Sequence, residues 1–120
     1  MSLPLRWHDE VVTDLRHVRA QFGVEAFAQA RRVVASLPGD PLLGEWLTEH
    51  AATGALSTCR KVKFGPDEIA ADGTNLGPVF RLVYRLLPSN TDARQVEVLS
   101  IDPRRDLIAY AVAAARMHRD

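Results

Sequence analysis

Basic side chains alternate with apolar ones in two segments of the chain, which read CRKVKF and FRLVYRL. Neighbouring side chains of a strand point to opposite faces, so Lys61 and Lys63 share one face of the first segment. Arg81 and Arg85 share a face of the second segment for the same reason. If the two strands are neighbours in a sheet, these cations gather on one face, and a polyanion is a natural ligand for them. The same pattern also fits solvated edge positions, where lysine protects a sheet against aggregation.

The composition limits what such a basic face can mean. The 120 residues carry fifteen Lys plus Arg and fifteen Asp plus Glu, and the isoelectric point is near 6.9, so a basic binding surface would be local and offset by acids elsewhere. Cys59 is the single cysteine, which excludes a disulfide framework and a thiolate metal cluster. No apolar run is long enough to span a membrane, and the N-terminus has no signal-peptide core. We therefore expect one cytoplasmic domain over residues 1–120.

The spacing of apolar residues predicts the elements that position these side chains. A period near 3.6 indicates three helices, and alternation indicates four strands. Their order is strand, two helices, three strands and helix, which predicts an α+β fold with a largely antiparallel four-stranded sheet packed against a helical hairpin. The expected elements are strands at Leu3–Trp7, Cys59–Phe64, Phe80–Leu86 and Arg94–Ile101, and helices at Asp9–Gln21, Val24–Leu37 and Pro103–Met117.

Smaller features of the chain give further expectations. Large apolar residues in Asp40–Thr58 predict a short helical or packed segment that caps the core, and both tryptophans are expected inside. Asp102 is expected to cap the last helix, with Pro103 in its first turn. Glu97 would form an ion pair with Arg85 if the strands pair in simple register. The four histidines have no spacing typical of a metal site.

The segment Gly65–Val79 reads as a long hairpin connection between two strands. It is rich in turn-forming residues and carries three acids, Asp67, Glu68 and Asp72. Because a hairpin needs only about two to five residues, this segment is an insertion. We expect a solvated loop; the alternative is a loop that covers the basic face and weakens RNA binding.

Taken together, these segments resemble one family of proteins. Lys61 and Lys63 match a Lys-x-Lys pair on the second strand of the RelE branch of the RelE/ParE superfamily of bacterial toxins. The segment 80–84, FRLVY, matches an aromatic-Arg-Leu-Val-Tyr strand of that branch. Arg104, followed six residues later by Tyr110, matches the Arg and Tyr that come after the fourth strand. The chain resembles the messenger-RNA interferases of this branch in the order of its elements over almost its whole length, and the specific similarity lies in these three segments.

The resemblance implies an endoribonuclease that needs neither a metal nor a cofactor and cleaves messenger RNA in the ribosomal A site. In that chemistry the ribose 2′-hydroxyl attacks the adjacent phosphate and leaves a 2′,3′-cyclic phosphate and a 5′-hydroxyl. Tyr110 or a lysine would accept the proton, cations would neutralise the extra charge, and Arg104 would lie near the leaving oxygen or clamp the phosphate. The implied catalytic residues are Lys61, Lys63, Arg81, Arg104 and Tyr110, and the implied RNA-binding residues are Arg60, Arg85 and Arg105.

The resemblance also implies a cognate antitoxin that wraps the toxin near its site, and it leaves the oligomeric state open. Two other functions remain possible. A ParE-like gyrase inhibitor shares the fold without this set of catalytic residues. A non-catalytic binding module is favoured by the neutral charge and by the acids of 65–79, and in it Tyr110 would be only a core residue of the last helix.

Overall fold

The computed structural model describes residues 2–47, 58–103 and 108–119. In this part of the chain the predicted order of elements is confirmed, with one short strand added. The helices are α1 (Val11–Phe22), α2 (Val24–Ser36) and α3 (Ile108–Arg119), and the strands are β1 (Leu5–Trp7), β2 (Glu45–Trp46), β3 (Cys59–Ile69), β4 (Asn75–Pro88) and β5 (Ala93–Pro103).

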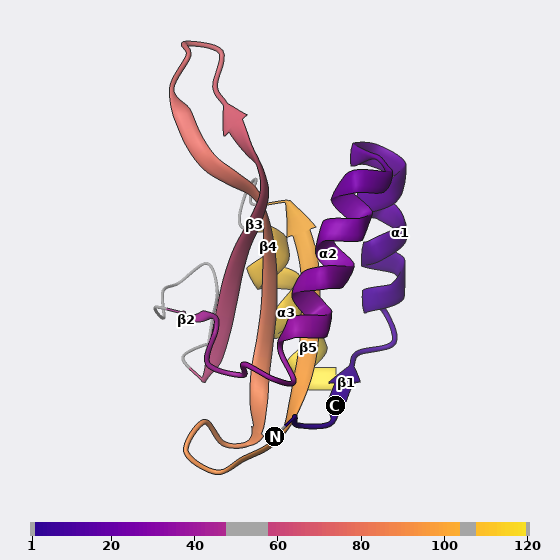
Figure 1. The fold of residues 1–120 in the computed structure, drawn as a ribbon, viewed down its shortest axis with the longest axis vertical. Coiled ribbons are helices and arrows are strands. Elements are labelled where there is room, and N and C mark those ends of the chain that lie inside the picture. Colours follow the sequence, from indigo (N-terminus) through magenta and orange to yellow (C-terminus); the bar gives the residue numbers. More distant parts are fainter. Residues whose placement is uncertain (1, 48–57, 104–107, 120) are drawn as a thin grey trace.

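The strands form one sheet in the order β1-β5-β4-β3-β2. β1 runs parallel to β5, and the other neighbours are antiparallel, which confirms the largely antiparallel sheet. The helical hairpin of α1 and α2 covers one face of the sheet and α3 packs on the other, so the sheet is the middle of three layers (Figure 1). The strands consequently carry two buried faces of different composition.

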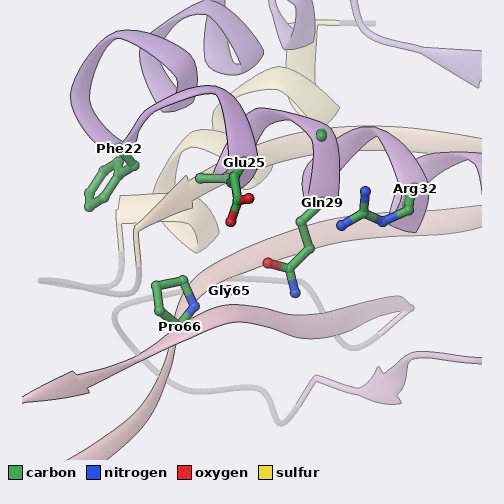
Figure 2. A pocket seen from close by; sticks show the side chains of 8 residues that line it. Phe22, Glu25, Gln29, Arg32, Gly65 and Pro66 are labelled. Carbon is green, nitrogen blue, oxygen red and sulfur yellow. The ribbon is translucent and has the colours of Figure 1, made fainter.

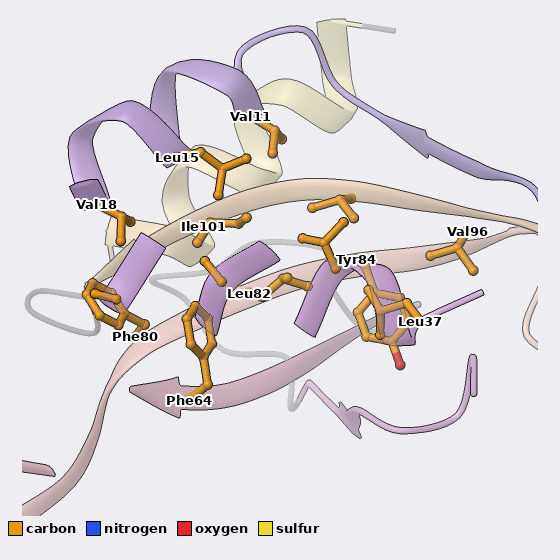
Figure 3. Close-up of a cluster of buried hydrophobic side chains, with 14 of the residues drawn as sticks. Val11, Leu15, Val18, Leu37, Phe64, Phe80, Leu82, Tyr84, Val96 and Ile101 are labelled. Atoms are coloured by element: carbon orange, nitrogen blue, oxygen red, sulfur yellow. The ribbon is translucent and has the colours of Figure 1, made fainter. Parts of the chain in front are cut away.

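The larger core lies between the helical hairpin and the sheet. Residues of α1 at spacings of three and four reach down to the strands, as expected for an amphipathic helix (Figure 3). Phe80 is fully buried at the centre of this core, with the Phe22 ring 4.7 Å and the Phe64 ring 5.3 Å from it. The main members are Val11, Leu15, Val18, Ala30, Val34, Leu37, Phe64, Phe80, Leu82, Tyr84, Val96, Val98 and Ile101.

The smaller core lies under α3. Alanines on the helix let it approach the strands closely, so that small side chains of β3, β4 and β5 are sealed beneath it. Cys59 is fully buried there, and its Sγ lies 3.8 Å from the Met117 Sδ. Burial raises the pKa of the Cys59 thiol to about 11, so this cysteine is an unreactive core residue. The members are Leu47, Cys59, Val83, Leu99, Ala109, Tyr110 and Ala113.

A buried ion pair joins the helical hairpin to α3 around the open edge of β5. β1 pairs only with residues 96–98, so among the described residues the backbone beyond has no strand partner on this side. There the Asp14 carboxylate accepts a hydrogen bond from the Ile101 amide at 3.0 Å, and the Arg116 guanidinium donates to the Leu99 carbonyl at 2.8 Å. The guanidinium also donates to both Asp14 oxygens, at 2.6 and 2.8 Å. Two side chains thus replace a missing strand.

The segment before β3 differs from its prediction. A short helical or packed segment was expected; Leu47 is packed in the smaller core, but Glu45 and Trp46 form β2 and pair with β3 in place of a helix. Gly44 precedes them at a point of close approach, since an added Cβ would lie 2.7 Å from the Tyr84 ring. The apolar run is interrupted there and is too short for a helix, so it pairs with the sheet edge instead. The remainder, 48–57, lies outside the described residues.

Both tryptophans are exposed rather than in the core, so that prediction is wrong. Trp7 is 41% exposed on the three-residue β1, and Trp46 is 52% exposed on the outermost strand. Short edge strands have little helix over them, which leaves large side chains uncovered. The Arg60 guanidinium lies over the Trp46 ring, 4.5 Å from its centre.

Residues 65–79 connect β3 and β4 as a hairpin, as expected, but most of the segment is a two-stranded arm where a solvated loop was predicted. β3 continues to Ile69 and β4 begins at Asn75, so the turn is short. The arm extends beyond Phe80, the first residue of β4 that pairs with β5, and projects past the helices (Figure 1). Gly65 begins it with φ of 97°, in an irregular stretch of β3 where a Cβ would lie 2.5 Å from the Phe80 ring.

The end of β5 also differs from the sequence prediction. Asp102 and Pro103 continue the strand, paired with Arg81 and Phe80, and do not begin a helix. Pairing with β4 holds the backbone extended here, which overrides the local preference for a helix start. Residues 104–107 lie outside the described residues. None of the described helices has both the length and the apolar character needed to cross a membrane.

Candidate active site

The register of β3 and β4 brings the predicted cations together. Lys61 lies opposite Val83 and Lys63 lies opposite Arg81, so these three basic side chains share the face on which α3 packs. Lys61 is half-buried and Lys63 is exposed at the end of the sheet body, just before the arm begins. The alternation in the sequence therefore predicted this face correctly.

Tyr110 reaches the same face from α3. It lies in the first turn of the described helix and packs in the smaller core, with 6% of its surface exposed. The Lys61 Nζ lies over the Tyr110 ring, 5.9 Å from its centre, in a cation–π contact. A strand and a helix separated by almost fifty residues thus place an amine beside a phenol.

Arg81 is more buried than a simple phosphate ligand, with 8% of its surface exposed. Its guanidinium donates to the Pro78 carbonyl at 2.8 Å and to the Phe80 carbonyl at 2.9 Å. These bonds fix the head group near the base of the arm. A guanidinium has five N–H donors, so two such bonds leave donors for a further acceptor.

The other arginines of the prediction are placed differently. Arg60 lies on the opposite face, donates to the Gly44 carbonyl at 2.7 Å and to Asn90 at 3.1 Å, and is not near Lys61 and Lys63. Arg85 lies opposite Glu97 and donates to it at 2.7 Å, so the predicted ion pair is confirmed. Glu97 is fully buried, and its other oxygen lies 3.2 Å from the Arg6 Nε.

Arg104 and Arg105, the remaining predicted site residues, lie outside the described residues. In the sequence they fall between the end of β5 and the start of α3. The site as described therefore consists of Lys61, Lys63, Arg81 and Tyr110.

One titratable group near this site was missed in the sequence. Asp102 is paired in register with Arg81, and its Oδ2 is buried without a hydrogen bond from another described residue. Burial, followed by the negative charge of Asp14, raises the pKa of Asp102 to about 7, while Arg116 opposes the shift. No local pattern in the sequence signals this burial, because it depends on the pairing of Asp102 with β4.

The described site has the parts for phosphate chemistry without a metal. Two amines and a guanidinium supply positive charge to phosphate oxygens, and a phenol can exchange a proton. Within the described ranges, no three His, Cys, Asp or Glu side chains gather in a way that could hold a metal ion.

Comparisons with known proteins identify the fold. No family model matches the chain, and no curated protein matches it in sequence. Among solved structures it is similar to Escherichia coli toxin RelE, a mutant with two arginine-to-alanine substitutions in the free state. The TM-score is 0.61, the identity is 18%, and the match covers 98% of this chain and 99% of that chain.

The chain is also similar to a chain of the toxin–antitoxin complex RelBE2 from Mycobacterium tuberculosis. Here the TM-score is 0.58 at 18% identity, over 87% of this chain and the whole of the other. The chain therefore has the RelE fold, which confirms the fold class that its sequence resembles. At this identity the likeness establishes the fold alone, so any activity has to be argued from the residues of the site.

Proposed function

We propose that the chain is the toxin of a toxin–antitoxin pair and that it cleaves messenger RNA on the ribosome through attack of a 2′-hydroxyl. The observation that carries the proposal is the contact between Lys61 and Tyr110, made across two elements in a chain with the RelE fold. The contact places an amine beside a phenol, and both of these groups can exchange a proton. It suits a site where a proton and a phosphate charge are handled together.

The roles follow from where each group lies. Tyr110 or Lys61 accepts the proton of the 2′-hydroxyl, because these two groups lie together and both can exchange a proton. Lys63 and Arg81 neutralise the charge that develops on the phosphorane, since they are cross-strand neighbours on the same face. Arg104 is proposed to assist the leaving oxygen. The ribosome would supply the orientation of the RNA.

An antitoxin is the proposed protein partner, because one of the structural neighbours comes from a toxin–antitoxin complex. A second candidate function, a non-catalytic binding module, has its own observation in favour. Arg81 is largely buried and donates to carbonyls of its own chain, and Arg85 is committed to Glu97. Two of the predicted cations thus already have structural partners.

Induced expression in a bacterial host distinguishes the two functions. The wild type, Tyr110→Phe and Lys63→Met are expressed, growth is followed, and the 5′ ends of messenger RNA are mapped. Arg94→Met is the matched control for Lys63→Met, because Arg94 is also an exposed cation on a strand but lies far along the chain from the site.

The proposal predicts growth arrest and new cuts within translated codons for the wild type and for Arg94→Met, and neither for the two site variants. Arrest without cuts would point to another target, such as gyrase. Growth that is unaffected by the wild type would favour the binding module.

A further inference from the structure

The charges of this chain are separated over its surface although they cancel in total. The arm, residues 65–79, carries Asp67, Glu68 and Asp72 and no Lys, Arg or His. The helical hairpin shows the reverse: between residues 15 and 36 it has four arginines, all exposed, and one acid, Glu25. One molecule thus presents an acidic projection and a basic helical surface.

The basic helical surface has a defined centre. The guanidinium carbons of Arg19 on α1 and Arg31 on α2 lie 5.7 and 5.9 Å from the centre of the Phe27 ring. Guanidinium groups held against a ring lose less freedom when they bind a carboxylate, so these side chains form a preorganised binding site for carboxylates. We call the surface formed by Arg16, Arg19, Phe27 and Arg31 the arginine face.

The arm is held by the pairing of its own two strands, and no side chain between residues 65 and 78 is buried. Ile69 is 58% exposed and Leu76 is 37% exposed near its tip. A two-stranded ribbon alone is marginally stable in water, because its few contacts barely offset the cost of ordering it. Contacts with another surface would therefore stabilise the arm, and that surface should combine apolar area with positive charge.

The arm does not lie on the hairpin of its own molecule. A groove of about 540 Å³ separates its base, at Gly65 and Pro66, from the side chains of Phe22, Glu25 and Arg32 (Figure 2). Phe22 and Val24, where the two helices meet, are 42% and 63% exposed. The hairpin thus offers the combination of apolar area and positive charge that the arm needs, but on a surface that its own arm does not cover.

We propose that the arm of one copy lies on the arginine face of a second copy, in a dimer with two-fold symmetry. Each contact then joins acids to arginines and places Ile69 near exposed apolar groups, and symmetry forms the contact twice. The zero net charge removes the overall repulsion that would otherwise oppose association of identical chains. This dimer is independent of the proposed catalytic function.

Sedimentation velocity of the full chain tests the dimer. The wild type should shift from monomer to dimer as its concentration rises from low micromolar to submillimolar values. The dimer should dissociate as salt is raised to about 1 M, where the screening length falls to about 3 Å. The double variant Asp67→Lys/Glu68→Lys should weaken the dimer at least about tenfold, since it reverses the charge of the arm.

A charge swap between two variants makes the test specific. Arg19→Glu/Arg31→Glu should also be monomeric, and an equimolar mixture of it with the arm variant should form a heterodimer. Asp9→Lys/Asp92→Lys is the matched control: it changes the net charge as the arm variant does, at exposed positions elsewhere, and should still self-associate. Circular dichroism checks that each variant is folded.

Three results would overturn the dimer. They are a wild type that stays monomeric throughout, a dimer that the arm variant weakens no more than its matched control does, and open-ended assembly in place of a closed dimer.

Discussion

The two faces of the sheet are stabilised by different physics. Under the helical hairpin the contacts are almost entirely apolar and centre on Phe80, which touches rings from α1 and β3. Under α3 the core is small, and charged groups surround it: Lys61 and Arg81 on the strands, and the buried pair of Asp14 and Arg116 at the edge. Burying charges lowers the free energy of unfolding unless each charge is paired, so the α3 face contributes less to stability than an apolar face would.

The two faces therefore contribute differently to stability and to the proposed activity. The hairpin face supplies most of the hydrophobic stabilisation, and the α3 face carries the polar groups of the proposed catalytic site. Substitutions on the first face should change stability, whereas those among the exposed cations of the second face should change activity.

The largest effect on stability is expected for Phe80→Ala. Removing a fully buried ring between Phe22 and Phe64 should lower the free energy of unfolding by about 4 kcal/mol, from lost transfer energy and the cavity left behind. Urea denaturation measures it. Phe22→Ala, at a ring that is 42% exposed, is the control and should cost clearly less. Equal losses for the two variants would contradict the central position of Phe80.

The second-largest loss of stability is expected when the ion pair between Asp14 and Arg116 is broken. Asp14→Ala leaves the Arg116 guanidinium and the Ile101 amide without their acceptor, and should cost about 3 kcal/mol. Burial would lower the pKa of Arg116, but the hydrogen bonds and charges of Asp14 and Glu10 raise it, so the group stays charged. The double variant Asp14→Leu/Arg116→Met should recover much of the loss. A double variant as unstable as the single one would show that specific hydrogen bonds, not an unpaired charge, dominate.

The elements of the hairpin face could be predicted because their signals are local. Val11, Leu15 and Val18 repeat at helical spacing, and the alternation of β3 and β4 decides which side chains face the helices. The same alternation placed Lys61 and Lys63 together and paired Arg85 with Glu97. Alternating patterns predict the faces of a strand correctly because one buried face fixes the register of the strand pairing.

The misses arose where distant contacts override local preference. The turn formers of 65–79 predicted a long solvated loop between two strands, yet strand pairing continues through most of the segment. Pro103 suggested a helix start, yet it pairs with Phe80. The edge pair of Asp14 and Arg116 has no sequence signal at all, because its members are 102 positions apart.

The substitution Asp102→Asn tests how the free energy of unfolding depends on pH at the α3 face. The pKa of Asp102 is raised from 3.8 to about 7 in the folded chain, so between these values the native state binds more protons than the unfolded state. The free energy of unfolding contributed by this group therefore falls as pH rises through this window. Since the group is only partly shielded from solvent, the loss should be about 1–2 kcal/mol.

Denaturation at pH 4.5 and at pH 8 measures this dependence, at pH values chosen as roughly inside and above the window. Asp102→Asn should be less sensitive to pH than the wild type, and relatively more stable at the higher value. Asp92→Asn, at an exposed acid, is the control. An unchanged pH dependence in Asp102→Asn would show that Asp102 titrates normally.

The smallest effect on stability is expected for Lys63→Met. Lys63 is exposed at the end of the candidate site, so the free energy of unfolding should change by no more than about 0.5 kcal/mol. RNA cleavage should nevertheless fall by about tenfold or more, because a charge that stabilises the phosphorane is lost. Thermal unfolding and cleavage rates are measured on the same preparations. A variant that keeps its cleavage rate would remove Lys63 from the mechanism.

Cleavage of messenger RNA by the purified protein in a reconstituted translation system tests the central claim most directly, with the wild type and Tyr110→Phe compared. The account predicts cuts within translated codons that leave a 2′,3′-cyclic phosphate and a 5′-hydroxyl, and their loss in a Tyr110→Phe variant that folds as the wild type does. Full cleavage by Tyr110→Phe would remove Tyr110 from the proton transfer. No cleavage by the wild type on translating ribosomes would contradict the catalytic function itself and leave the α3 face as a binding surface.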